Sequence, residues 1–308
     1  KIFKPIFGCE MYCARRGMLT KEEKTDQSGW HLIVLAKNEK GYHNLIKLVS
    51  QSFVDGFYMR PRTDHAQLEK YREGLIICSA CIGGEIPRKI LSGQLEAAEE
   101  RARWFKERWG DDFYLEIQRH EVTDPNQRAN RETYPLQVKV NKVLLEMGAK
   151  LGIKVICSND VHFVDQENAE AHDRLLCLGT NRDLDDPKRM LYTKQEWFKT
   201  RAEMEAIFQD LPEVMANTCE VLDKVETYSI DHPPIMPNFA IPKSFGTEEE
   251  YRQKFTDKQL FEEFTRDENG NVVLSEKDAI DKVKKLGGTE KLYRLKLEAD
   301  YLSYLAYN

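Results

Sequence analysis

The sequence has 308 residues, which is enough for one sizeable hydrophobic core with an appended segment. Its formal charge of −6 argues against a protein that coats nucleic acid without regard to sequence, since such a protein would be basic overall. No apolar run approaches the roughly 20 residues of a membrane-spanning helix, and no signal peptide opens the chain, so we expect a cytoplasmic protein.

Short apolar runs alternate with longer amphipathic segments over the first 163 residues. The apolar runs predict strands at 4–10, 30–36, 75–81, 113–117 and 155–163. Helical spacing of apolar residues predicts helices at 41–53, 92–109 and 136–147. Strands that alternate with helices of this length indicate right-handed crossovers and a mostly parallel sheet or barrel.

Polar side chains that could bind a metal or act in catalysis end several of the predicted strands. They are Glu10, Cys81, His120, and Asp160 with His162. In β/α barrels, the side chains at the C-terminal strand ends surround one site. Asp160 and His162 are two residues apart, so on an extended backbone both would leave the same side and could hold a divalent cation. A loop aspartate and an ordinary hydrogen-bonded histidine remain the alternative.

The pattern changes after residue 180. A turn is predicted at 184–189, a strongly helical stretch at 200–225 and a Pro-rich connector at 232–239, which we interpret as a domain boundary. Residues 247–308 are charged and helical, with little apolar content for a core of their own. Seven scattered cysteines, an odd number, predict reduced thiols and no disulfide framework.

Sequence blocks along nearly the whole chain are similar to one family. The blocks lie at 5–12, 31–32, 56–64, 79–81, 159–163, 172–177 and 184–189. In order and spacing they resemble the polymerase-and-histidinol-phosphatase (PHP) domain of bacterial DNA polymerase III alpha subunits. The resemblance implies an α/β fold, with a distorted β/α barrel of the PHP type over residues 1–230. It also implies a mostly helical extension at 231–308, containing a connector and the beginning of the polymerase palm.

The resemblance also implies a cluster of divalent metals at the barrel mouth. The ligands carried over are Glu10, His31, Cys81, Asp160 and His162, with Asp160 and His162 also catalytic and His120 a pocket neighbour. A thiolate favours zinc, while the oxygen donors keep manganese possible. The family's opening His-x-His strand and Asp-His turn supply further ligands. Since neither occurs here, we expect a chain truncated at its N-terminus, with the first strand or strands of the barrel missing.

The activity implied for the parent protein is DNA-directed DNA polymerisation with magnesium, a nucleotidyl transfer in DNA replication. Its catalytic aspartates are expected beyond Asn308. The PHP domain would act as a 3′-to-5′ exonuclease that proofreads by metal-assisted phosphodiester hydrolysis. The implied partners are a DNA primer-template, a separate proofreading exonuclease and a sliding clamp, with no membrane. Arg60 and Arg62 are candidate DNA contacts, the alternative being solvated loop charges.

Two other functions are weighed against the exonuclease. One is a non-catalytic scaffold that stabilises the polymerase and docks a separate proofreading exonuclease. Retention of the ligand type at the five carried-over positions favours the active version. The other is a free-standing PHP phosphatase acting on histidinol phosphate, which the polymerase-type blocks at 57–64 and 185–189 disfavour.

Overall fold

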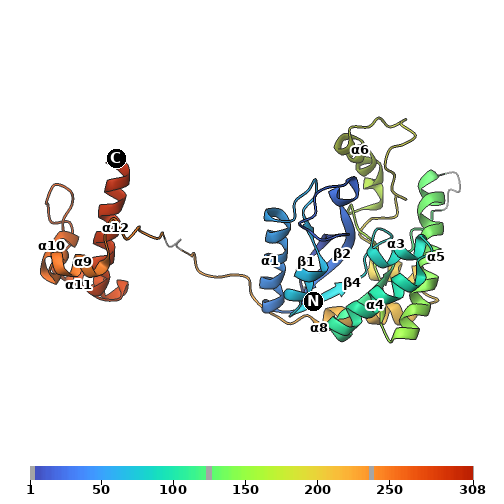
Figure 1. The fold of residues 1–308 in the computed structure, drawn as a ribbon, viewed down its shortest axis with the longest axis horizontal. Coiled ribbons are helices and arrows are strands. Elements are labelled where there is room, and N and C mark those ends of the chain that lie inside the picture. Colours follow the sequence, from blue (N-terminus) through green and yellow to red (C-terminus); the bar gives the residue numbers. More distant parts are fainter. Residues whose placement is uncertain (1–3, 123–126, 236–238, 308) are drawn as a thin grey trace. The chain divides into compact units, whose positions relative to one another are not determined.

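The computed structural model describes residues 4–122, 127–235 and 239–307, so residues 236–238 of the predicted connector lie outside the described part. The chain divides into two compact units, Lys1–Asp231 and His232–Asn308 (Figure 1). The first contains the sheet and all the candidate site residues. The second is helical apart from its loops.

In the described residues of the first unit, six strands form one open sheet in the order β3-β1-β2-β4-β5-β6. The strands are β1 (Gly8–Ala14), β2 (Gly29–Ala36), β3 (Arg62–Thr63), β4 (Leu75–Cys78), β5 (Phe113–Ile117) and β6 (Val155–Cys157). β2 runs antiparallel to both of its neighbours, β1 and β4, while the other three pairings are parallel. The predicted mostly parallel order is therefore interrupted at β2. The segment between β1 and β2 holds only a short 3-10 helix, and antiparallel strands can be joined without a crossover helix.

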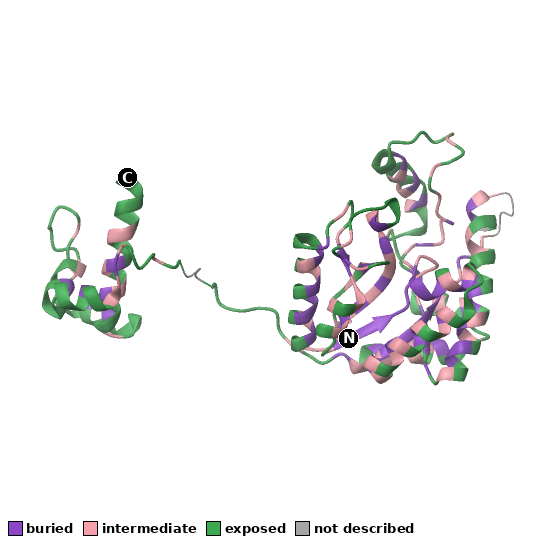
Figure 2. Ribbon diagram, in the orientation of Figure 1, coloured by how far each residue is buried: buried purple, intermediate pink, exposed green. Residues whose placement is uncertain are grey.

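The two faces of the sheet have different partners, because successive strand residues point to opposite sides. On one face, Val34, Ile77 and Leu115 pack in the main core with three long helices. Figure 2 shows buried residues on the strands and on the helices beside them. These helices are α1 (Glu39–Val54), α4 (Leu95–Trp109) and α5 (Arg128–Leu151). On the other face, Ile76 and Tyr114 pack with residues of α8 (Pro212–Lys224). This second face is only partly covered, and it carries the cavity described below.

Helix α8 also covers the edge of the sheet at β6. The Asn217 side chain donates to the Val155 carbonyl at 2.8 Å, and the Cys157 N–H donates to Thr218 Oγ1 at 3.1 Å. Side chains thus occupy backbone groups that an edge strand would leave unpaired. The helical stretch predicted at 200–225 is in fact two helices, α7 (Arg201–Ile207) and α8.

Three predicted strands have clearly wrong bounds, including the one predicted at 75–81, which ends at Cys78 and leaves Cys81 in the following turn. The first begins at Gly8, later than predicted, and continues to Ala14, so Glu10 lies inside β1 and not at its end. The last predicted strand ends at Cys157, so the segment that follows turns instead of remaining extended. The other helices of this unit are α2 (His65–Lys70), α3 (Glu85–Leu91) and α6 (Ala169–Thr180). The seven cysteines are all free, as predicted.

The second unit has a hydrophobic core of its own, contrary to the prediction from its composition. Its helices are α9 (Glu248–Lys254), α10 (Asp257–Phe264), α11 (Glu276–Leu286) and α12 (Glu290–Tyr307). Each helix contributes apolar residues to a shared cluster of Tyr251, Leu260, Val283, Leu292, Tyr293 and Leu297. A few apolar residues suffice because helical spacing places them on one face of each helix. Among the described residues, no helix combines the length and apolar character that crossing a membrane requires.

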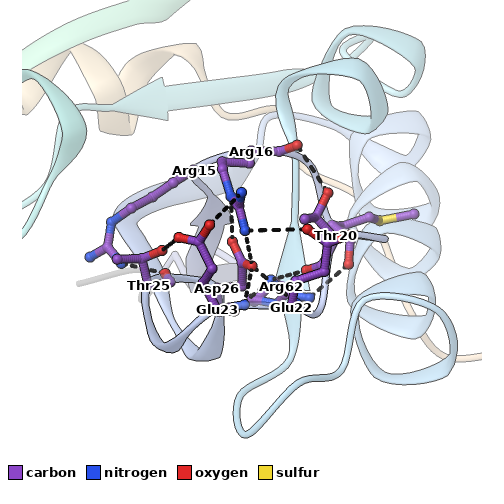
Figure 3. Close-up of polar contacts among 9 residues, drawn as sticks. Arg15, Arg16, Thr20, Glu22, Glu23, Thr25, Asp26 and Arg62 are labelled. Atoms are coloured by element: carbon purple, nitrogen blue, oxygen red, sulfur yellow. Dashed lines mark hydrogen bonds and ion pairs between the residues drawn. The ribbon is translucent and has the colours of Figure 1, made fainter.

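The segment between β1 and β2 is held by a buried arginine, Arg62 (Figure 3). Its guanidinium donates to the carbonyls of Gly56 at 2.9 Å, Thr20 at 3.1 Å, Asp26 at 2.5 Å and Met18 at 2.7 Å. Arg62 is fully buried, so it cannot present its charge to DNA as the sequence had suggested.

The same segment contains a second buried charge, Asp26. Its carboxylate accepts from Arg16 at 2.5 Å and from the N–H groups of Glu22 and Glu23. These donors, Arg16 first among them, hold the pKa of Asp26 well below its usual range. The loop between β1 and β2 is therefore ordered by Asp26, whose donors lie within it, and by Arg62, which donates to three of its carbonyls.

Replacing Arg62 by methionine should lower the free energy of unfolding by about 3 kcal/mol, because four carbonyl groups lose a charged donor in a buried site. Arg60→Met is the matched control, since Arg60 is exposed and its loss should change stability by less than about 0.5 kcal/mol. Urea denaturation of both variants measures the difference. Equal stability of the two variants would contradict the stabilising role of the Arg62 hydrogen bonds.

Candidate metal centre

The reversed direction of β2 brings His31 beside Glu10. Tyr12 pairs with His31 across β1 and β2, and Glu10 lies two residues before Tyr12 on the same face of β1. Diagonal neighbours on an antiparallel pair are within reach of long side chains. Glu10 Oε1 accordingly lies 2.7 Å from His31 Nδ1. His31 begins its strand, yet it reaches the site because β2 starts where β1 ends.

Cys81 completes a group of three donors. β4 ends at Cys78, and Ala80 takes a left-handed conformation, with φ of 62°, in the turn that leads to Cys81. The sulfur lies 3.5 Å from His31 Nδ1. The Gly83 N–H donates to the sulfur at 3.4 Å, and the Gly83 carbonyl accepts from the His31 N–H at 3.1 Å. A Cβ on Gly83 would lie 3.2 Å from His31 Cγ, so a side chain there would press on the imidazole ring.

The three donor atoms suit a divalent cation. The ligand atoms of Glu10, His31 and Cys81 all lie within 4.8 Å of one another. A tetrahedral zinc ion would hold a nitrogen and a sulfur ligand about 3.5 Å apart, as His31 Nδ1 and Cys81 Sγ are placed here. Three protein donors, one each of oxygen, nitrogen and sulfur, also match the number found in catalytic zinc sites.

The surroundings of His31 favour its protonated form. Hydrogen bonds to Cys81, and then to Glu10, raise the pKa of His31 to about 10. The protonated imidazole is therefore favoured at neutral pH, with Cys81 and Glu10 as its hydrogen-bond neighbours. A cation bound here would replace this proton, because metal-ligating histidines are neutral.

Asp160 and His162 form a pair of their own. Asp160 Oδ1 lies 3.5 Å from His162 Nε2, and neither residue belongs to the group of three donors. Burial is the largest single influence on Asp160 and acts to raise its pKa, but the bond to His162 and the attraction of His162, His120 and His31 together lower it. Asp160 in turn raises the pKa of His162. Strand alternation does not bring them together, contrary to the prediction. Asp160 has a φ of 45°, and the His162 N–H donates to the Glu196 carbonyl at 2.8 Å.

His120 supports this turn from behind. It is 2% exposed, and its Nε2 lies 3.1 Å from the Asn159 carbonyl, next to Asp160. Gln137 Nε2 lies 3.1 Å from the other ring nitrogen. Burial lowers the pKa of His120, so the neutral ring is favoured there. Its contacts are those of a residue that holds the Asn159–Asp160 backbone in place.

A cavity of about 670 Å³ opens on the partly covered face of the sheet. Glu10, Cys81 and Asp160 all contribute to its lining, which joins the group of three donors to the Asp160–His162 pair. Much of the remaining wall is apolar, formed by residues such as Ile33, Ile156 and Met215.

Two buried charged residues of the cavity were missed in the sequence. Glu116 lies on β5, 6% exposed, and accepts hydrogen bonds from Ser158 and from Gln118. Burial raises its pKa, and repulsion from Asp160 and Glu10 adds to this. A lone carboxylate inside the apolar run 113–117 was the available signal. For the other residue, Lys199, the sequence offers no signal, because its burial depends on the packing around it.

Comparison with known proteins gives a consistent family assignment. The family model for the PHP domain matches residues 1–120. DNA polymerase III subunit alpha of Borreliella burgdorferi is 43% identical over 256 residues, covering 82% of this chain and 21% of that protein. The proteins of the same name from Treponema pallidum and Thermus aquaticus are 34% and 35% identical, covering 85% and 82% of this chain and 22% and 20% of their own lengths. The chain thus spans about a fifth of these relatives.

The raised pKa of Glu116 predicts a pH-dependent effect of Glu116→Gln on stability. Because the folded-state pKa exceeds the unfolded value, the carboxyl group contributes most below about pH 4, and this contribution is lost as the pH rises through the folded-state pKa. Glutamine keeps the contact with Ser158 but carries no charge. We expect Glu116→Gln to gain stability relative to the parent between pH 4 and pH 8, by on the order of 1 kcal/mol. Urea denaturation at both pH values measures this, and a pH-independent difference would contradict it.

Proposed function

Because this chain belongs to the PHP-domain family and matches a segment of DNA polymerase III alpha subunits, we propose that its first unit is a metal-dependent phosphoesterase module of a bacterial replicative polymerase. Its proposed reaction is 3′-to-5′ exonucleolytic hydrolysis of DNA, in the cytoplasm. The observation that carries this proposal is the group of Glu10, His31 and Cys81, with donor atoms within 4.8 Å beside a cavity that Asp160 also lines.

Each side chain has a proposed role. Glu10 would supply a carboxylate oxygen, His31 its Nδ1 and Cys81 a thiolate, a donor set that favours zinc while leaving manganese possible. A cation held by them would act as a Lewis acid toward a phosphodiester. Asp160 would offer a further oxygen to the same cavity. It also raises the pKa of His162, whose Nε2 lies 3.5 Å away, so that His162 would serve as an acid next to the site.

The remainder of the proposal concerns the larger protein. Residues 232–308 would form the connector and the start of the palm of a magnesium-dependent DNA polymerase. The partners would be a primer-template, a sliding clamp and a separate proofreading exonuclease. Arg60, exposed in the loop before β3, remains a candidate DNA contact.

One observation supports a non-catalytic scaffold as the second candidate. Asp160 and His162 bond to each other and do not join the three clustered donors. A centre with only three donors could bind a structural ion without hydrolysing DNA. The scaffold and the exonuclease therefore share the metal and differ in activity.

The metal content of the chain tests the site itself. Purified without chelator and without a histidine tag, the chain should carry at least one zinc or manganese ion, measured by elemental analysis. His31→Ala should abolish binding, because it removes the central donor of the group. His43→Ala is the matched control, since His43 is exposed and its nearest charged partner is Glu39 on the same helix. Equal metal content in both variants would contradict the site.

Hydrolysis by the intact alpha subunit tests the activity. A DNA strand labelled at its 3′ end should be shortened only when zinc or manganese is present. Asp160→Asn should reduce the rate by about 100-fold, since a catalytic group next to the metal contributes about 2–3 kcal/mol to the transition state. If the metal-loaded subunit leaves the strand intact, the scaffold replaces the exonuclease as the function of the domain.

A further inference from the structure

A buried cation in the cavity is left unused by the function proposed above. Lys199 is 9% exposed and lies at the end of the loop that leads into α7. Its ammonium group donates to the Gln195 carbonyl and lies 3.2 Å from the centroid of the Trp197 ring. Within residues 4–122, 127–235 and 239–307, no carboxylate oxygen comes within 4.0 Å of this group.

A buried ammonium group with no carboxylate in contact is unfavourable, because the more distant charges of Glu196 and Glu203 replace its lost hydration only in part. The loss of hydration lowers the pKa of Lys199 to about 8, so the group still carries its charge at neutral pH. One carbonyl and one aromatic ring compensate only part of this cost. An anion entering the cavity would compensate the rest of the cost of burying the Lys199 charge.

The cavity places this cation with the candidate metal centre. Lys199 lines the same space as Glu10, Cys81 and Asp160. A volume of about 670 Å³ is within the range of about 300–1,000 Å³ that is usual for small-ligand sites. The apolar wall offers a surface for a base or a sugar. An anion held between a bound cation and an ammonium group, with an apolar body beside it, has the chemistry of a nucleotide.

We propose that Lys199 binds the phosphate of a nucleotide in this cavity and positions it against the candidate metal centre. The proposal rests on the function proposed above and names the residue that positions the scissile phosphate. Arg201 lines the same cavity but does not share the role. Its side chain is 75% exposed and donates to Glu205 at 2.7 Å, so its charge is already satisfied in solvent.

Binding of thymidine 5′-monophosphate tests this without relying on catalysis. Isothermal titration of the zinc-loaded 308-residue chain should show at least 10-fold weaker binding for Lys199→Met than for the parent. Lys199→Arg should retain most of the affinity because it keeps the charge. Arg201→Met is the matched control and should change the affinity by less than about 2-fold, since an exposed ion pair contributes little.

Two further readouts separate the possible failures. Unchanged affinity in Lys199→Met, or equal losses in Lys199→Met and Arg201→Met, overturns the proposal even when the metal is bound. If the chain holds no metal but still binds the nucleotide through Lys199, the metal function fails and the phosphate site stands. If Lys199→Met does not fold, the NMR resonance of the Lys199 Cε carbon in the parent replaces it as the test. The resonance is assigned by its absence in Lys199→Arg, and it should shift when inorganic phosphate is added. An unmoved resonance also overturns the proposal.

Discussion

The antiparallel placement of β2 is the constraint on which the candidate centre depends. In a fully parallel sheet, a residue at the start of a strand lies at the edge opposite the C-terminal ends. Because β2 runs against β1 and β4, its first residues meet the ends of both neighbours. His31 therefore reaches Glu10 from one strand and Cys81 from the turn after another. A single reversed strand thus converts three distant residues into one donor group.

The reversal in turn depends on an ordered connection between β1 and β2. Arg62 supplies that order by donating to carbonyls on both sides of the loop, and Asp26 adds a second buried charge whose donors lie within the loop. Buried charges are stable only when hydrogen bonds satisfy them, as they are here. The cavity shows the contrasting case. Glu116 responds to burial with a raised pKa, whereas Lys199 retains a charge that a ligand could satisfy.

The sequence predicted the elements with a strong hydrophobic period. Strand β5 was predicted with its observed bounds, and α4 was found within a slightly longer prediction. Strand direction was not predictable from apolar patterning, so the participation of His31 rested on family resemblance alone. The left-handed conformation of Asp160 and the burial of Arg62 were missed as well, since both depend on contacts with segments far away in the chain. Hydrophobic periodicity predicts which face of a helix or strand is buried, but it does not predict which residues a polar side chain contacts.

The most direct test of the centre is the zinc K-edge X-ray absorption spectrum of the zinc-loaded chain. The account predicts one sulfur neighbour at about 2.3 Å, together with nitrogen and oxygen neighbours at about 2.0 Å. The sulfur shell should disappear in Cys81→Ser and persist in Cys9→Ser, whose thiol lies outside the donor group. A spectrum without sulfur, or one that Cys81→Ser leaves unchanged, would show that zinc binds elsewhere and would contradict the centre.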